Sequence, residues 1–261
     1  MTDSLGGPGI VLALVLAEVA IGGVAVLWVA PLWGRVKTGF FKLAGGVLAA
    51  IAILAWLAAR GPLGDAASTP ARVAAALLLA FAALTVAGQA LLWLRAHTPA
   101  RMAGVASIPA GAAALVAIAF EPAAARAPAI AIFQVLAGAV FAGAFTDGLL
   151  LGHWYLVDRK LSREPLAFVN ALFLGGCALA AVAGALAISG GGTASPDLSP
   201  LLGAGALAAY LAIGLVALCA TIGVFIRALV KESSIQAATG LFYLGVIMGL
   251  AAEFASKVRF F

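Results

Sequence analysis

Eight long apolar segments follow one another along the chain, separated by short polar stretches that contain most of the prolines and basic residues. Each segment has about 20 residues or somewhat more, the length of an α-helix that crosses a hydrocarbon layer of roughly 30 Å. Backbone groups must be paired in hydrocarbon, and these segments do not alternate as barrel strands do, so helices are expected. We predict an all-α, polytopic membrane helix bundle with about eight transmembrane helices, forming a single domain over residues 1–261. The predicted helices are 9–32, 41–59, 72–94, 102–120, 129–155, 165–188, 201–229 and 235–256.

The composition makes lipid the solvent for most of the chain. Of the 261 residues, 65% are hydrophobic and 10% are charged, whereas a soluble domain is about half apolar and about a quarter charged. The net charge of +5 comes from basic residues in the gaps between segments, where they indicate topology and headgroup contacts rather than nucleic-acid binding. The two cysteines have no Cys/His framework around them, so we expect neither a metal site nor a disulfide scaffold.

The basic residues are unequally divided between the two sides of the predicted bundle. Ten fall on one side and five on the other, and the side richer in Lys and Arg faces the cytoplasm. We therefore predict a multi-pass protein of the plasma (inner) membrane with both termini on the non-cytoplasmic side. The five cations assigned to the sparser side are Arg60, Arg72, Arg126, Lys257 and Arg259.

The first four and the last four predicted helices start on the same side of the membrane, which allows a parallel duplication into residues 1–125 and 126–261. Parallel repeats occur in transporters, with the site at the repeat interface. Chance matches in an apolar sequence of low complexity are the alternative. Two pairs of residues that align across the halves are Gly22 with Gly148 and Trp28 with Trp154.

Glu18 lies near the middle of the first apolar segment. An ionisable side chain at this depth is unfavourable, and by default it indicates a functional role. No Lys or Arg lies at comparable depth in any predicted helix, so we expect Glu18 to be protonated or hydrogen-bonded to a polar neighbour or water. A carboxyl group that loads and releases a proton is what a proton-coupled carrier needs, and a protonated packing residue is the structural alternative.

Asp147, on the fifth segment, falls within a turn of the position that the duplication matches to Glu18. Two acids near a pseudo-symmetry axis would suit a coupling site, whereas a local hydrogen bond and snorkelling to the interface is the alternative. Gln89 and Gln134 are expected either to line a transport path or to hydrogen-bond neighbouring helices. We predict Glu18 and Asp147 as proton-coupling residues and the two glutamines as path residues.

Two further acids, Glu121 and Glu253, are predicted near the outer surface of the membrane. Glu253 is followed four residues later by Lys257, a spacing that pairs opposite charges along a helix. We interpret both acids as interface residues.

The densest group of polar and aromatic residues covers residues 152–160, at the predicted cytoplasmic surface. Aromatic and basic side chains commonly anchor a helix at the headgroup layer, which is the simplest interpretation. The alternative is a redox site in which a histidine binds haem or donates a proton to a quinone. Its candidate residues are His153, Trp154, Tyr155 and Arg159, with His97 as a second candidate haem ligand on the same side.

The chain contains no HExxH, Walker A, GxSxG or multiple-histidine motif, so we predict no catalytic residues and favour a role other than that of an enzyme. We predict a small transporter or permease, coupled to protons through its buried acids, with no cofactor. The alternative is the membrane subunit of a respiratory or redox complex, an oxidoreductase that binds quinone or haem; an enzyme or assembly factor without a known motif is a third hypothesis. The expected partners are the lipid bilayer and either other membrane subunits or a second copy of the chain.

Overall fold

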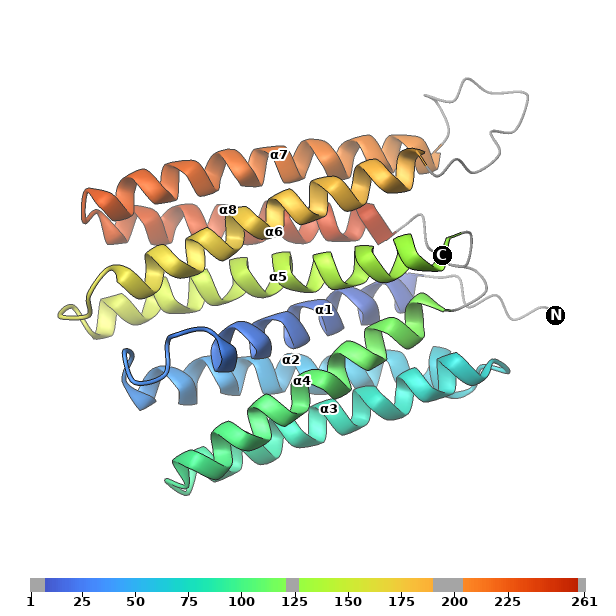
Figure 1. The fold of residues 1–261 in the computed structure, drawn as a ribbon, viewed down its shortest axis with the longest axis horizontal. Helices are drawn as coiled ribbons and strands as arrows, with labels where there is room; N and C mark the ends of the chain where they lie inside the picture. The colour runs from blue at the N-terminus through green and yellow to red at the C-terminus, as the bar shows by residue number, and fades with distance from the viewer. Residues whose placement is uncertain (1–7, 121–126, 190–203, 258–261) are drawn as a thin grey trace.

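The computed structural model describes residues 8–120, 127–189 and 204–257, and these form eight long α-helices (Figure 1). All eight are long and apolar enough to cross a membrane, which confirms the predicted polytopic membrane bundle. Glu121 and residues 190–203, which include the beginning of the predicted helix 201–229, lie outside the described residues. The helices are α1 (Pro8–Val29), α2 (Thr38–Gly64), α3 (Thr69–Trp93), α4 (His97–Ala119), α5 (Pro128–Val157), α6 (Glu164–Ser189), α7 (Ala204–Lys231) and α8 (Ile235–Lys257).

The helix ends follow local rules of capping. The Ser68 hydroxyl accepts a hydrogen bond from the Ala71 N–H at 3.2 Å and begins α3, and Pro128 stands in the first turn of α5, where its missing N–H is not needed. Two ends differ from the prediction by five residues: α4 begins at His97 rather than at residue 102, and α2 continues past Ala59 to Gly64 with Pro62 inside it. A proline is tolerated there since neighbouring groups in a membrane bundle can satisfy the freed carbonyl.

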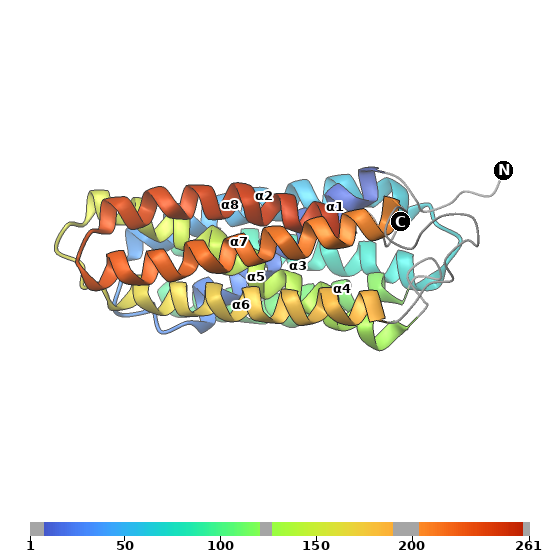
Figure 2. The same cartoon turned by 90° about the horizontal axis from the view of Figure 1, so that it is seen from above.

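The helices form two groups of four that meet along α1 and α5. In the first group α1 packs against α2 and α4, and in the second α5 packs against α6 and α8. Figure 1 shows the two groups side by side, and Figure 2, turned by 90°, shows the second group in front of the first. The beginning of α1 and the end of α8 lie at the same end of the bundle. Helix α1 is the most enclosed of the eight spans, as expected for a helix that is apolar all round.

Small residues hold α1 and α5 together at the centre of the bundle. A Cβ atom added to Gly22 would lie 1.7 Å from the carbonyl oxygen of Ala139, and one added to Gly143 would lie 2.1 Å from the carbonyl carbon of Gly22. Close backbone approach of this kind stabilises helix pairs in lipid, where burial of apolar surface supplies no driving force between them. This contact fixes the position of Glu18 relative to α5.

The two halves have the same order of neighbouring helices, but the residues aligned by the duplication have different surroundings. Gly22 packs on the backbone of α5, whereas Gly148 packs against Phe242 of α8. Trp28 packs against Gly104 of α4 within its own half, whereas Trp154 packs across the two halves, against α2. The duplication is therefore not shown and stays a prediction.

The outer surface of the bundle is apolar along the helices. Large apolar side chains are well exposed on several of them, among them Leu54, Trp93, Val224, Phe225 and Ile247. Exposed apolar surface on this scale is incompatible with a water-soluble monomer. We conclude that the protein is a multi-pass membrane protein whose surface contacts the lipid bilayer.

Candidate functional site

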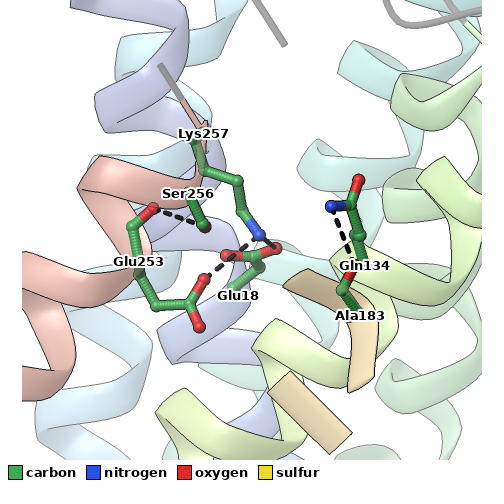
Figure 3. Close-up of polar contacts among 6 residues, drawn as sticks. All are labelled: Glu18, Gln134, Ala183, Glu253, Ser256 and Lys257. Carbon is green, nitrogen blue, oxygen red and sulfur yellow. Dashed lines mark hydrogen bonds and ion pairs between the residues drawn. The ribbon is translucent and has the colours of Figure 1, made fainter. Parts of the chain in front are cut away.

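Three ionisable side chains meet inside the bundle. The Lys257 Nζ atom lies 2.8 Å from Oε1 of Glu18 and 3.1 Å from Oε2 of Glu253. The exposed fractions of Glu18, Glu253 and Lys257 are 0%, 3% and 2%, so the whole group is enclosed by protein. Figure 3 shows the lysine ammonium joined by dashed lines to both carboxyl groups. We call these three residues the ion cluster.

The ion cluster joins the two halves of the bundle. Glu18 lies about 15 Å along α1 from its first residue, whereas Glu253 and Lys257 lie one turn apart in the last turns of α8. The positive charge of Lys257 is favoured at this position, because the C-terminal end of a helix carries partial negative charge.

Gly138 of α5 makes room for the two carboxyl groups. A Cβ atom added to it would lie 2.8 Å from Oε1 of Glu18 and 2.9 Å from Oε2 of Glu253. Both oxygens therefore lie next to the same point on α5, close to each other as well as to the lysine. A side chain at this position would displace at least one of them.

Among the residues that the structure describes, the charges of the ion cluster do not balance. Two ionised carboxylates and one ammonium leave an excess of one negative charge, and a buried net charge is strongly unfavourable. Oε2 of Glu18 has no hydrogen-bond partner among the described residues, so a further cation or proton that binds to it breaks no hydrogen bond there. The cluster becomes neutral when it binds one proton or one monovalent cation.

A cavity of about 40 Å³ lies beside the ion cluster, between α5, α6, α7 and α8. Its polar lining comes from Glu253, Ser256, Lys257 and Gln134, and small residues of α6 and α7 complete it. Gln134 donates a hydrogen bond from Nε2 to the Ala183 carbonyl at 3.4 Å (Figure 3). A cavity of this size, with four polar side chains in a largely apolar lining, accommodates about two or three water molecules.

The structure corrects two predictions about these residues. The expectation that no cation reaches the depth of Glu18 is wrong, because the long stem of Lys257 carries its ammonium inward from the end of α8. The interpretation of Glu253 as an interface residue is also wrong, since its side chain is buried in the ion cluster. The predicted pairing of Glu253 with Lys257 at i, i+4 is confirmed. That spacing, together with an isolated Glu18 in need of a cation, was the signal in the sequence.

Asp147 is fully buried, but it does not join the ion cluster. It lies on α5 nine residues beyond Gly138, a rise of about 13 Å. Both of its carboxyl oxygens lack a hydrogen-bond partner among the described residues. The two predicted coupling acids, Glu18 and Asp147, are therefore at separate sites.

The two predicted path glutamines also separate. Gln134 lines the cavity, whereas Gln89 donates from Nε2 to the Phe41 carbonyl at 3.3 Å and lies against Gly45. Gln89 therefore links α3 to α2, outside the group of helices that surrounds the cavity.

The aromatic and basic cluster near the end of α5 is spread over different surfaces. His153 is exposed, and its Nδ1 lies 3.0 Å from the Tyr243 hydroxyl of α8. The Tyr155 hydroxyl donates to the carbonyl of Ser162 at 2.5 Å, and Trp154 packs on Phe40 of α2. These contacts connect α5 to α2, to α8 and to the loop that follows α5.

The two histidines do not come together. His97 begins α4, which packs on α3 in the first group of helices, whereas His153 contacts α8 in the second (Figure 1). Arg159 is exposed beyond the end of α5. In the described ranges no three His, Cys, Asp or Glu side chains are grouped as metal ligands. Haem or quinone binding stays an untested prediction.

Comparisons with known protein families, with curated proteins and with solved structures find no match for this chain.

Proposed function

We propose that this protein is a small membrane carrier that exchanges protons for a small monovalent cation. The observation that supports this function is the ion cluster of Glu18, Glu253 and Lys257, buried beside a cavity that Ser256 and Gln134 also line. When all three groups are ionised the cluster has one excess negative charge. One proton or one monovalent cation neutralises it, and the two compete for the same charge.

This competition provides a mechanism of coupling. A cation that binds next to Glu18 and Glu253 favours loss of the proton, and protonation favours release of the cation, because linkage between two binding events is reciprocal. Oxygen atoms of the carboxylates, of Ser256 and of Gln134 are the ligand type that hard cations prefer. The cavity, with a volume of about 40 Å³, has space for about two or three water molecules and therefore for a small inorganic cation.

The position of the ion cluster connects its charge to the arrangement of the helices. Glu18 belongs to the first group of helices, and Glu253 and Lys257 belong to the second. Binding a proton weakens the attraction between Lys257 and the protonated carboxyl group, and so changes the force between α1 and α8. A carrier needs such a link between occupancy and conformation, since a ligand shifts an equilibrium only through its differential affinity for the two states.

The test uses purified protein in sealed liposomes that contain a pH-sensitive dye. Outward gradients of Li⁺, Na⁺ or K⁺ are imposed in turn, and the internal pH is followed. We expect at least one cation to drive proton uptake into the liposomes, and Glu18→Gln to abolish it. Glu232→Gln is the matched control, because Glu232 is exposed and lies outside the ion cluster, and it should transport normally.

Two results would reject the proposal. One is the absence of cation-driven proton movement in the wild-type protein with all three cations. The other is normal exchange by Glu18→Gln. Thermal unfolding of each variant shows whether a loss of transport reflects a loss of the folded protein.

A second function is supported by the His153–Tyr243 pair, which places two hydrogen-bonding groups on an exposed surface of the bundle. A quinone that diffuses in the lipid could accept a hydrogen bond there, as the redox alternative proposes. The test is quinone reduction in membranes together with a reduced-minus-oxidised visible spectrum of the purified protein. Turnover that is unchanged in His153→Ala, together with a flat spectrum, would remove this alternative.

A further inference from the structure

One face of α5 carries a row of polar groups toward the end of the helix where Val157 lies. Trp154 is seven residues after Asp147, and Asp158 is four residues after Trp154. Steps of seven and four residues return to the same face of an α-helix. These three residues therefore form a stripe from the interior of the bundle to its surface.

The inner end of the stripe is Asp147, an acid that makes no stabilising polar contact among the described residues. Asp147 is 0% exposed, and neither carboxyl oxygen has a hydrogen-bond partner among the described residues. No charged side chain in the described parts of α1, α2, α4, α6 or α8, the helices that pack on α5, interacts with it. Burying a carboxyl group without a hydrogen-bond partner is unfavourable by about 1–3 kcal/mol even when the group is neutral. Asp147 therefore stabilises the fold no better than a leucine would.

The middle and the outer end of the stripe continue toward water. The Trp154 ring packs against Gly39 and Phe40, and its buried Nε1 has no hydrogen-bond partner among the described residues. Asp158 lies 3.0 Å from the ammonium of Lys37, whose side chain is 73% exposed. An acceptor at Asp147 and a donor at Trp154 are about 10 Å apart along α5, with the buried Leu151 between them on the same face of the helix. A short chain of water molecules beside Leu151 would bridge this distance.

We infer that Asp147 is a second proton-binding site, reached by water along this face of α5 from the end of the bundle that carries Asp158 and Lys37. The site is separate from the ion cluster, since Gly22 and Gly143 bring the backbones of α1 and α5 together between the levels of Gly138 and Asp147. At that contact an added Cβ atom would already overlap the neighbouring backbone, so no water passes between the two helices there.

The two acids are placed symmetrically along α5. Gly138, which contacts Glu18, lies ten residues after the start of α5, and Asp147 lies ten residues before its end. Each acid is therefore about 15 Å from its own end of the helix. In the proposed function, the ion cluster would exchange protons with one side of the membrane and Asp147 with the other. This role of Asp147 in transport rests on the proposed function. The site itself is tested without any transported solute.

The experiment is infrared spectroscopy of the lipid-reconstituted protein labelled with ¹³C at aspartate side chains. The carbonyl band of a protonated aspartic acid identifies Asp147 if Asp147→Asn removes it. On transfer from H₂O to D₂O we expect this band to shift promptly, because water reaches the site. Trp154→Phe keeps the packed ring but lacks the indole N–H, and should slow the shift about tenfold. Trp93→Phe is the control, since Trp93 is an exposed residue of α3, and should leave the rate unchanged.

Four results would overturn the inference. Three of them are the absence of a protonated band that depends on Asp147, a band that does not exchange in D₂O over hours, and unchanged exchange in Trp154→Phe; the fourth concerns Glu18. Glu18→Gln should leave the exchange rate at Asp147 unchanged, and slower exchange in that variant would show that protons arrive from the ion cluster instead. Normal exchange at Asp147 in a protein that moves no cations would reject the proposed function and leave this site standing.

Discussion

Replacing Lys257 by methionine tests whether the lysine ammonium compensates the charge of the two buried carboxyl groups. The substitution keeps most of the apolar stem and removes the ammonium that lies 2.8 Å from Glu18 and 3.1 Å from Glu253. Two carboxyl groups then remain buried with no cation in the cluster. Removing one partner of a buried ion pair costs about 3–5 kcal/mol, because the remaining charge is left uncompensated. We expect Lys257→Met to lower the free energy of unfolding by this amount.

The assay is thermal unfolding in a mild detergent, followed by loss of the monodisperse peak in size-exclusion chromatography. For a chain of this length, the expected loss corresponds to a fall of roughly 10 °C in the melting temperature. Lys160→Met is the matched control, because Lys160 lies on an exposed loop, and it should change the melting temperature little. Adding Glu18→Gln and Glu253→Gln to Lys257→Met removes all three charges and should restore most of the lost stability.

The rescue separates an electrostatic effect from a loss of packing. If the Lys257→Met variant melts at the wild-type temperature, the ammonium does not compensate the two carboxyl groups inside the bundle. If the triple variant is as unstable as the single variant, the loss comes from the shape of the lysine stem rather than from its charge. Either result would refute the reasoning from charge balance.

Three further predictions concern the fold around the site. Gly22→Ala should lower the free energy of unfolding by about 1–3 kcal/mol, because its Cβ atom would lie 1.7 Å from a carbonyl oxygen of α5. Gly46→Ala is the control. A Cβ atom there would have nothing within 4 Å, so this variant should be neutral or stabilising in the same melting assay. Gln89→Leu loses one hydrogen bond between α3 and α2, worth about 0.6 kcal/mol in a membrane bundle. It should leave cation-driven proton movement intact. Loss of transport in a stable Gln89→Leu protein would show that Gln89 belongs to the transport path. Lys37→Ala breaks the ion pair with Asp158, in which the lysine is 73% exposed. Denaturation should therefore show that the free energy of unfolding changes by less than about 1 kcal/mol. A larger loss would mean that this ion pair is shielded from water.

The number, length and type of the spanning elements could be predicted from the sequence, because they depend on local properties. A run of about 20 apolar residues is long enough to cross the hydrocarbon layer, and backbone pairing in lipid leaves the helix as its solution. The helix ends near Ser68 and Pro128 follow from capping and proline geometry in the same local way. The extension of α2 through Pro62 could not be predicted, since it depends on neighbours that satisfy the backbone.

The sequence also identified Glu18 as a residue out of place, because a carboxyl group in the middle of an apolar helix is unfavourable wherever the other helices lie. The partner of Glu18 was decided by the tertiary structure alone. Lys257 is at the other end of the chain, and its ammonium reaches Glu18 because α1 and α8 both pack against α5, where Gly138 leaves room for the carboxyl groups. Helix rotation and depth arise from side-chain packing between segments, which hydropathy does not encode.

The same reason explains why Glu18 and Asp147, alike as buried acids in the sequence, occupy different sites. Each was recognisable alone, because burial of an acid in an apolar run is a local property. Their separation by about 13 Å along α5 depends on where α1 crosses α5, and the contact of Gly22 with Gly143 sets that crossing. The sequence by itself determined a bundle of eight spanning helices with isolated buried charges, and only the packing of its glycines decided which charges meet.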